Sequence, residues 1–396
     1  MVQVGRDARW GVEARRVHAR GSVRWEVTRL FVPPDPRPEM ASPRSFRGSE
    51  QAPRIRDRSG KEISMRRNGF MLVCVIVGAI LIGSCAKPYH TQAERYVFVT
   101  TNIDLPYWRE AEAGFQDAAK ELGVRGELIG PKGYQPNAEL VMFRQLVEEH
   151  PTGICLSAAR PEIFKEQIDK AIAEGVPVIC VDADSPDSKR LAYVGTDNNR
   201  AGRESVKQMA DLLSGGGKIV VLSIPGQMNL DDRVAGVAEA LRNYPAIKLI
   251  DIIDDKGDVK VAAEQVFDML KKKDKDKVDG FIALEATGGA GAAEALHALN
   301  MEGKIPIVAF DDDPATLELI ERGVIAASIA QKPYVMSYYG LKLLDDLHHG
   351  AVHQFKDWKT ALAPPMPVFV DTGTVVVNKN NVKAYREGLA GHAKAK

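Results

Sequence analysis

Cysteine is scarce in this chain, and neither sign of charge is in excess. Only four cysteines occur among 396 residues, namely Cys74, Cys85, Cys155 and Cys180. So few cysteines exclude a small domain held together by disulfides. The 53 basic and 53 acidic residues give a net charge of zero, which does not favour nucleic acid as a partner. Apolar residues make up 45% of the chain, enough for the cores of two or three domains.

The sequence also lacks the motifs of common enzymes. The glycines of Gly215–Lys218 do not have the spacing of a phosphate-binding loop, and those of Gly288–Gly291 do not have the spacing of a dinucleotide-binding loop. The histidines show no zinc-ligand spacing with cysteines, and no Ser or Cys lies in a nucleophile elbow. We therefore expect no enzyme, no cofactor and no metal site. The alternative is a doubly wound α/β enzyme that works through carboxylates at its strand ends.

A basic and then apolar segment is typical of a secretory signal. Arg66 and Arg67 precede the apolar run of residues 70–82, and small residues then lead to Cys85. This order resembles a bacterial lipoprotein signal, in which the cysteine becomes the lipidated first residue. The competing interpretation is an uncleaved transmembrane helix, but the run is short for a span of about 20 residues. We predict a signal peptide over 65–84, lipidation at Cys85, a tether over 85–94, and an extracytoplasmic protein anchored to the membrane.

Residues 1–64 differ in composition from the rest of the chain. Arginine is abundant there and lysine occurs once, at Lys61, whereas lysine is common after Cys85. Apolar periodicity is absent, and prolines cluster between Pro33 and Pro38. One interpretation is a disordered basic arm. The other, which we favour because a signal peptide stands at the start of a protein, is that translation begins at Met65 and that 1–64 is a mis-annotated upstream segment.

After the tether, short apolar runs alternate with amphipathic helical segments. Residues 96–101 predict a strand, and the apolar residues between Trp108 and Leu122 recur at spacings of three and four, which predicts a helix. The pattern continues and then restarts at Lys218, giving two units of similar size. Alternating strands and helices indicate βαβ units and parallel sheets. We predict an α/β fold of two lobes, with a ligand cleft between them at the carboxyl ends of the strands.

Polar residues stand where the predicted strands end. They are Thr101, Asn102, Ser157, Asp182, Asp197, Asn198, Glu285 and Asp311. Any one of them can be explained as a turn or helix-cap residue, because Asp and Ser are common at such positions. The whole set facing one cleft favours a ligand site instead.

Aromatic and basic residues complete this predicted site. Tyr107 and Trp108 are adjacent at the start of a helix and cannot both face the core, so we expect one in the core and the other stacked on a flat apolar face such as a sugar ring. Carboxylates accept several hydrogen bonds and an arginine donates several, which suits hydroxyl groups. Arg233 is that donor or, alternatively, forms a surface salt bridge with Asp231 or Asp232.

The order of motifs over residues 96–390 resembles the type I periplasmic binding proteins of the ribose-binding group. The resembling motifs are Leu105–Trp108, Val176–Asp182, Gly195–Asn198, Asp232–Gly236, Ile307–Asp311, Ile329–Pro333, Asp371–Gly373 and Val375–Lys379. The resemblance implies two Rossmann-like lobes with parallel sheets, 95–198 plus 332–370 and 199–331 plus 371–390, joined by a three-segment hinge. It also implies a monomer that captures a monosaccharide or polyol by lobe closure and delivers it to an ABC transporter permease. The alternative partner is a membrane receptor or kinase for which the chain senses the ligand.

The resemblance also assigns roles to single residues. It gives ring stacking or hydroxyl binding to Tyr107, Trp108, Asp182, Arg233, Asp311 and Gln331, and these join Ser157 and Glu285 in the predicted site. Three positions depart from the family's pattern. Leu105, Ala183 and Glu285 stand where ribose-type members often have Asn, Arg and Asn. Two hydrogen-bonding groups are lost and one carboxylate is gained, which puts ribose in doubt and permits another sugar, a polyol or a cationic ligand.

The two cysteines of the predicted folded part, Cys155 and Cys180, each lie two residues before a strand end. We expect them to face the same side of neighbouring parallel strands, where a disulfide is possible outside the cytoplasm. The awkward geometry of such a bridge favours free buried thiols.

Overall fold

A computed structural model describes residues 10–19, 22–31, 89–271, 277–351 and 357–394. The chain divides into two compact units, residues 1–86 and 87–396. The predicted signal peptide and Cys85 lie outside the described residues. Among the helices of the described ranges, none is long and apolar enough to cross a membrane.

The first unit contains an antiparallel hairpin. Strand β1 (Trp10–Ala19) pairs with strand β2 (Ser22–Phe31), and Ala19 lies opposite Ser22 at the turn. No regular element was predicted in this part of the chain, because consecutive arginines interrupt the apolar alternation that marks a strand.

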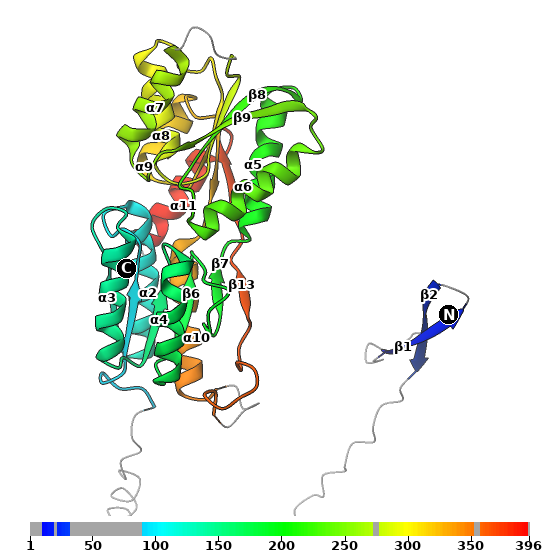
Figure 1. Cartoon of the computed structure of the whole chain (residues 1–396), viewed down its shortest axis with the longest axis vertical. Helices are drawn as coiled ribbons and strands as arrows, with labels where there is room; N and C mark the ends of the chain where they lie inside the picture. Colours follow the sequence, from blue (N-terminus) through cyan, green and yellow to red (C-terminus); the bar gives the residue numbers. More distant parts are fainter. Residues whose placement is uncertain (1–9, 20–21, 32–88, 272–276, 352–356, 395–396) are drawn as a thin grey trace, which may run out of the picture. The chain divides into compact units, whose positions relative to one another are not determined.

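The second unit is built on two six-stranded sheets, one in each lobe (Figure 1). The sheet of the N-terminal lobe has the order β13-β7-β6-β5-β3-β4, and its neighbouring strands are parallel. Its strands are β3 (Arg95–Val99), β4 (Arg125–Ile129), β5 (Gly153–Leu156), β6 (Val178–Val181), β7 (Tyr193–Gly195) and β13 (Phe369–Asp371). The buried central strands are short apolar runs, as expected for a parallel sheet that is covered on both faces.

The sheet of the C-terminal lobe has the order β14-β12-β11-β10-β8-β9. Its strands are β8 (Gly216–Ser223), β9 (Ala246–Asp254), β10 (Gly280–Ala283), β11 (Ile307–Phe310), β12 (Ala327–Ala330) and β14 (Val375–Asn378). Only β14 runs antiparallel to its neighbour in this described sheet. The two sheets have the same arrangement when the strands are counted from β13 in one lobe and from β14 in the other. Strand β6 is the third strand of the first sheet, and β11 is the third strand of the second.

Helices cover both faces of each sheet. In the N-terminal lobe, α2 (Pro106–Leu122) and α10 (Pro333–His348) pack on one face, and α3 (Pro136–Glu148) and α4 (Pro161–Ala173) on the other. In the C-terminal lobe, α5 (Asn198–Leu212) and α6 (Met228–Leu241) lie on one face, opposite α7 (Val259–Lys271), α8 (Gly288–Ala298), α9 (Pro314–Arg322) and α11 (Val382–Lys394). The predicted α/β fold with two lobes is confirmed.

The chain crosses between the two lobes at three places. The crossings lie between β7 and α5, between β12 and α10, and between β13 and β14. Side-chain contacts reinforce them: Thr196 Oγ1 donates to Gln331 Oε1 over 2.8 Å, and Arg200 Nη2 lies 2.7 Å from Asp371 Oδ2. The crossings therefore hold one another in place at the base of the space between the lobes.

The register of the N-terminal sheet corrects one prediction about the cysteines. Cys180 pairs with Leu156, so Cys155 is offset by one residue and faces the opposite side of the sheet. Cys155 packs under α10 beside Gly340, whereas Cys180 belongs to the core on the other face. Both thiols are buried and free, and burial raises the pKa of each. The expectation that they face the same side was wrong because sequence spacing does not give the register between strands.

Candidate functional site: a polar cavity between the lobes

A cavity of about 60 Å³ lies between the lobes, at the carboxyl ends of the strands. Its lining comes from both lobes and consists of Thr101, Asn102, Leu105, Tyr107, Trp108, Tyr134, Asp182, Ile224, Gln227, Asn229, Leu230, Arg233, Gly257, Glu285, Ala286, Asp311 and Gln331. Seven of the eight predicted site residues are among them, and the eighth, Ser157, lies directly behind. The volume suffices for a few water molecules, so a larger ligand would need the lobes to move apart.

Asp182 follows strand β6 and is the central acceptor of the N-terminal lobe. Tyr107 Oη donates to its Oδ1 over 2.6 Å, and Ser157 Oγ donates to its Oδ2 over 3.2 Å. Burial raises the pKa of Asp182, while the hydrogen bond from Tyr107 and the charge of Arg233 oppose that rise. Its carbonyl accepts from Tyr193 Oη over 2.7 Å, which fixes the backbone here. The two hydroxyl donors leave each carboxylate oxygen with further lone pairs for a ligand.

Asp311 follows strand β11 and occupies the equivalent position in the C-terminal lobe. Gln331 Nε2 donates to its Oδ1 over 2.8 Å, and Ser328 Oγ donates to its carbonyl over 2.5 Å. Burial raises the pKa of Asp311 well above its usual range, against the opposing charge of Arg233. Asp182 and Asp311 both have a positive φ, 70° and 64°. A non-glycine residue in this region carries strain, and such strain is typical of functional sites.

Arg233 on α6 is the cation of the site and is only 1% exposed. Its Nε donates to Asn198 Oδ1 over 2.9 Å, its Nη1 donates to the carbonyl of Leu284 over 2.6 Å, and its guanidinium lies 4.5 Å from the Phe310 ring centroid. Nη2 has no hydrogen-bond acceptor among the described residues. The alternative of a surface salt bridge with Asp231 or Asp232 was wrong, because the side chain turns inward. A buried donor without a protein partner is suited to a ligand oxygen.

Tyr107 and Trp108 both line the cavity and both belong to the core of the N-terminal lobe. Their rings meet edge to face with centroids 5.0 Å apart, and Trp108 also meets the edge of Phe98 at 5.9 Å. The expected division into one core ring and one ligand ring was therefore too simple. Because α2 begins where β3 ends, its first turn faces the core on one side and the cavity on the other.

Glu285 follows β10, and its carboxylate is turned toward the first turn of α8. Oε2 accepts from Thr287 N and from Thr287 Oγ1, each over 2.8 Å, and Oε1 accepts from Gly288 N. These bonds satisfy amides that a helix leaves without partners at its N-terminus, where a negative charge is also favourable. Beside it, burial and the Glu285 carboxylate raise the pKa of Asp255 to about 9. Glu285 is thus engaged with the protein on the edge of the cavity.

Asn102, one of the predicted polar strand-end residues, lines the cavity, but its Oδ1 accepts from Asp104 N and Gly133 N, so its amide oxygen organises the loops. Tyr134, Gln227 and Asn229 also line the cavity and were not predicted as site residues. Tyr134 donates to the carbonyl of Ala159 over 3.0 Å. It lies in the loop between β4 and α3, and because β4 was not predicted, this loop was not recognised as one that follows a strand. Gln227 and Asn229 lie at the start of α6, and Asn229 stands about one helical turn before Arg233, a spacing that could have drawn attention to it.

A larger depression of about 720 Å³ lies elsewhere, at the amino ends of the N-terminal strands. It is lined by loop residues such as Pro151, Gly175 and Pro367 and by the end of α10. The buried Asp182, Arg233 and Asp311 are absent from its lining. No His or Cys is among the described residues that line the interlobe cavity, so its donor set suits hydroxyl groups better than a soft metal ion.

Two α/β lobes joined by three crossings around a buried polar cavity define the class of type I periplasmic binding proteins. The chain belongs to this family, since residues 96–351 match the family described as "Periplasmic binding protein domain". Among curated proteins it is 24% identical over 276 residues to the D-allose-binding periplasmic protein of Escherichia coli, covering 67% of this chain and 88% of that protein.

Solved structures give the same result. A sugar-binding protein of a sugar ABC transporter from Bacillus halodurans is 34% identical, with a TM-score of 0.67 over 74% of this chain and 100% of the other. The arabinose-binding protein AraP from Geobacillus stearothermophilus is also 34% identical, with a TM-score of 0.63 over 74% of this chain and 98% of the other. These relatives are named as binding proteins, and none of the three names describes an enzyme.

Proposed function

We propose that this protein captures a neutral monosaccharide, of the pentose or hexose class, or a polyol, and delivers it to an ABC transporter permease. The observation that carries the proposal is the placement of Asp182 and Asp311 at equivalent strand ends of the two lobes, with the charge of Arg233 acting on both carboxyl groups. A ligand that bonds to both carboxylates joins the lobes. Burial of the ligand then creates the closed form that a permease can distinguish from the open one.

The carboxylates, guanidinium and aromatic rings that line the cavity suit a ligand with several hydroxyl groups. A carboxylate accepts two hydroxyl hydrogen bonds, a guanidinium donates to several oxygens, and the rings of Tyr107 and Trp108 offer apolar faces and edges to C–H groups. A cationic ligand is disfavoured, because the additional carboxylate of Glu285 is bonded to α8. The names of the allose-, arabinose- and sugar-binding relatives support a sugar without selecting one.

The proposed place of action is outside the cytoplasmic membrane. The relatives' description as periplasmic proteins supports this location, and the lipoprotein-like segment before Cys85 supports a lipid anchor. An anchored binding protein stays within reach of a permease in the same membrane. A receptor or kinase in that membrane is the alternative partner, and it would receive the same closed form.

Ligand binding by the full chain tests the proposal directly. Thermal unfolding is measured against a panel of pentoses, hexoses, polyols, amino acids and nucleosides, and each ligand that raises Tm is then titrated by calorimetry. A ligand present at 100 times its Kd stabilises the folded state by about 2.7 kcal/mol, which a thermal shift detects readily. We expect a rise with one or a few sugars or polyols and none with amino acids.

Two matched variants locate the binding site. Asp311→Asn replaces one acceptor oxygen of the buried strand-end carboxyl group by an amide donor, and we expect it to weaken sugar binding at least tenfold. Asp268→Asn makes the same change on the exposed face of α7 and is expected to bind as the unchanged protein does. Equal affinity of both variants would remove Asp311 from the site, and a response to cationic ligands alone would overturn the neutral-sugar assignment.

A further inference from the structure

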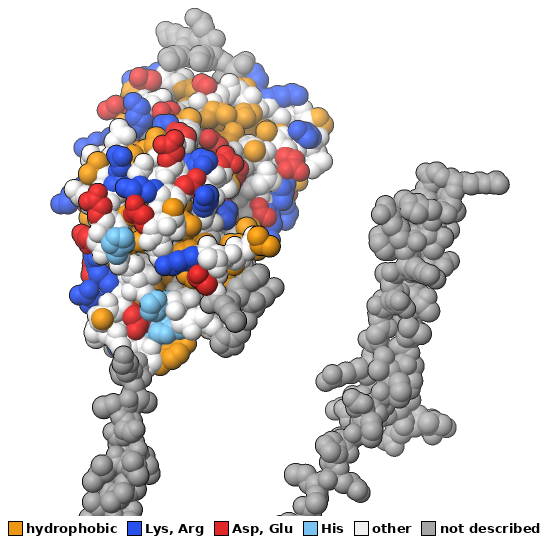
Figure 2. All heavy atoms as spheres, turned by 60° about the horizontal axis from the view of Figure 1, so that its bottom comes forward, with side chains coloured by type: hydrophobic (Ala, Val, Ile, Leu, Met, Phe, Trp, Pro, Cys, Tyr) orange, Lys and Arg blue, Asp and Glu red, His pale blue; other side chains and the backbone are white. Residues whose placement is uncertain are grey.

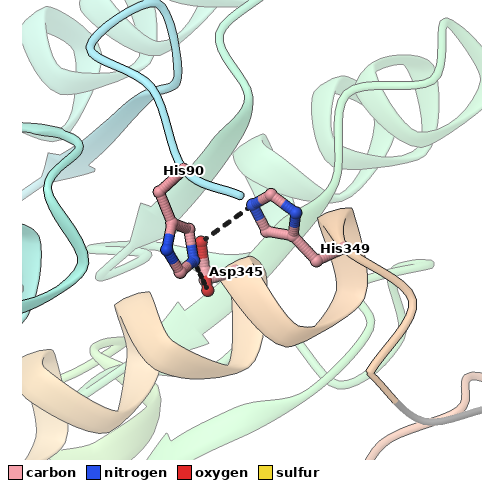
Figure 3. A group of neighbouring side chains, drawn as sticks. All are labelled: His90, Asp345 and His349. Atoms are coloured by element: carbon pink, nitrogen blue, oxygen red, sulfur yellow. Dashed lines mark hydrogen bonds and ion pairs between the residues drawn. The ribbon is translucent and has the colours of Figure 1, made fainter. Parts of the chain in front are cut away.

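A second group of side chains that can bind a metal ion lies in the N-terminal lobe, at the end of the lobe opposite to the interlobe cavity. His90 precedes β3, and Asp345 and His349 lie at the end of α10, as Figure 3 shows. Glu94, next to the first residue of β3, reaches the same place. We call these four residues the histidine–carboxylate cluster. Figure 2, which turns this end of the molecule forward, shows histidine side chains at the surface beside acidic ones.

The contacts within the histidine–carboxylate cluster converge on two imidazole nitrogens. His90 Nε2 lies 3.0 Å from Asp345 Oδ2. His349 Nε2 lies 3.0 Å from Glu94 Oε2 and 3.6 Å from Asp345 Oδ1. The two 3.0 Å contacts are hydrogen bonds or ion pairs, and the 3.6 Å contact is too long for a hydrogen bond. When both imidazole nitrogens are unprotonated, every atom at the centre offers a lone pair. A cation at the centre satisfies all of these acceptor atoms together.

Neighbouring groups hold the carboxylates and one ring in these orientations. Thr91 donates to Glu94 Oε1 from its backbone N over 2.8 Å and from its hydroxyl over 3.1 Å. The buried hydroxyl of Tyr96 donates to Asp345 Oδ1 over 3.2 Å. The ring of Tyr89 stacks on His349 with centroids 4.3 Å apart. Such supporting contacts are what orient the ligands of a metal ion.

We propose that the histidine–carboxylate cluster binds a zinc ion. Imidazole nitrogens and carboxylate oxygens are ordinary zinc ligands, and three of them with a water molecule complete a tetrahedral site. The ligand atoms of His90, Asp345 and His349 already lie within 4.8 Å of one another, so shifts of under about an ångström bring them to zinc-binding distance. Glu94, whose Oε2 lies 3.0 Å from His349 Nε2, reaches the edge of this group of three. The sequence hid this site because its ligands lie 255 residues apart along the chain.

Zinc in this position links two segments that no strand pairing joins. Residues 89–94 enter the lobe here, and the end of α10 is the last helical part before the chain turns back toward β13. The ion therefore fastens the entry of the chain to the lobe. This proposal does not depend on sugar binding, because the histidine–carboxylate cluster and the interlobe cavity lie at opposite ends of the strands of the N-terminal lobe.

Zinc binding is tested on the untagged full chain after treatment with a chelator. Calorimetry with zinc chloride should give about one ion per chain, and cobalt(II) should give the visible absorption of a tetrahedral complex. We expect His90→Ala and His349→Ala each to weaken zinc binding at least tenfold. The matched control is His297→Ala, which removes an exposed histidine that pairs with Glu302 over 3.2 Å in the other lobe.

The folded state of each variant is checked by circular dichroism, and sugar binding serves as a separate readout. Zinc should raise Tm of the unchanged protein and of His297→Ala, reversibly with chelator, and should leave Tm of Asp345→Asn nearly unchanged. Zinc uptake that is the same in His90→Ala, His349→Ala and the control would overturn the proposal. So would a chelated protein that takes up no zinc. Loss of sugar binding with zinc uptake intact would instead count against the proposed function alone.

Discussion

Replacing one buried carboxyl group should stabilise the C-terminal lobe. Asp255 is fully buried behind the interlobe cavity, beside the carboxylate of Glu285. Its Oδ1 accepts a hydrogen bond from Gly257 N over 3.1 Å. Burial and this neighbour raise the pKa of Asp255 to about 9, so the group carries a proton at neutral pH. Asparagine has the shape of the protonated acid, keeps an acceptor for Gly257 and cannot ionise. Asp255→Asn therefore removes an ionisable group from the interior and retains the packing around it.

The sign of the effect follows from proton uptake. An aspartate in the unfolded chain titrates near 3.9, far below the folded value. Between these two values the folded protein holds one proton more than the unfolded chain, so the free energy of unfolding falls as pH rises. One full proton corresponds to about 1.4 kcal/mol per pH unit, or at most about 2.7 kcal/mol from about pH 6 to pH 8. Relaxation of the structure around the Asp255–Glu285 pair reduces this pH-dependent loss of stability. Between about pH 6 and pH 8, we therefore expect the free energy of unfolding to fall by about 1–2 kcal/mol more in the unchanged protein than in the variant.

Urea unfolding followed by far-ultraviolet circular dichroism measures this difference at both pH values. The free energy of unfolding of Asp255→Asn should fall less than that of the unchanged protein as pH rises. The matched control is Asp268→Asn, which changes an exposed carboxylate on α7 and should follow the unchanged protein. An identical pH dependence in Asp255→Asn and Asp268→Asn would refute the reasoning, because it would mean that Asp255 ionises normally in the folded state.

Three further changes test the packing and the site. Tyr107→Phe deletes the donor to Asp182 Oδ1 and should lower the free energy of unfolding by about 1–3 kcal/mol and weaken sugar affinity, measured by urea unfolding and calorimetry. Gln331→Ala removes a bridge between a lobe crossing and a strand-end carboxylate, so sugar affinity should fall at least tenfold by calorimetry. Gly114→Ala places a methyl group 2.1 Å from the carbonyl oxygen of Tyr334, and Tm should drop by several degrees.

Each of these changes has a control in the same chain. Tyr339→Phe alters an exposed tyrosine and Gln116→Ala an exposed glutamine, so both should leave affinity unchanged. Gly388→Ala adds a methyl group with no heavy atom within 4 Å, in helix α11, where alanine is the better helix former. It should raise Tm slightly. A drop in Tm equal to that of Gly114→Ala would contradict the close contact between α2 and α10.

The fold was predictable because its signal is periodic. Buried parallel strands appear as short apolar runs and the helices between them as amphipathic segments, so the α/β alternation could be read directly. Strand β4 was missed for a physical reason. It lies at an edge of its sheet, and its residues are exposed or half-buried, so it has no apolar run to mark it. Its absence from the prediction also concealed Tyr134.

The site was predictable to the extent that it follows strand ends. Asp182, Glu285 and Asp311 were identified because parallel strands all end at one edge, and each lines the cavity. Directions of side chains were not predictable. Arg233 turns inward because Asn198 and the Leu284 carbonyl accept from it, and both belong to segments distant along the chain. The register of β5 and β6 likewise decided which side the cysteines face.

The three crossings between the lobes have a consequence for binding thermodynamics. A ligand held by one lobe meets the other lobe as part of the same molecule, so the second set of bonds forms at an effective concentration fixed by the covalent connections. Because three short segments restrain the lobes, this concentration stays high even when they part. Each lobe can therefore hold the ligand weakly while the pair holds it tightly. Release follows when the lobes separate, because each lobe alone holds the ligand only weakly.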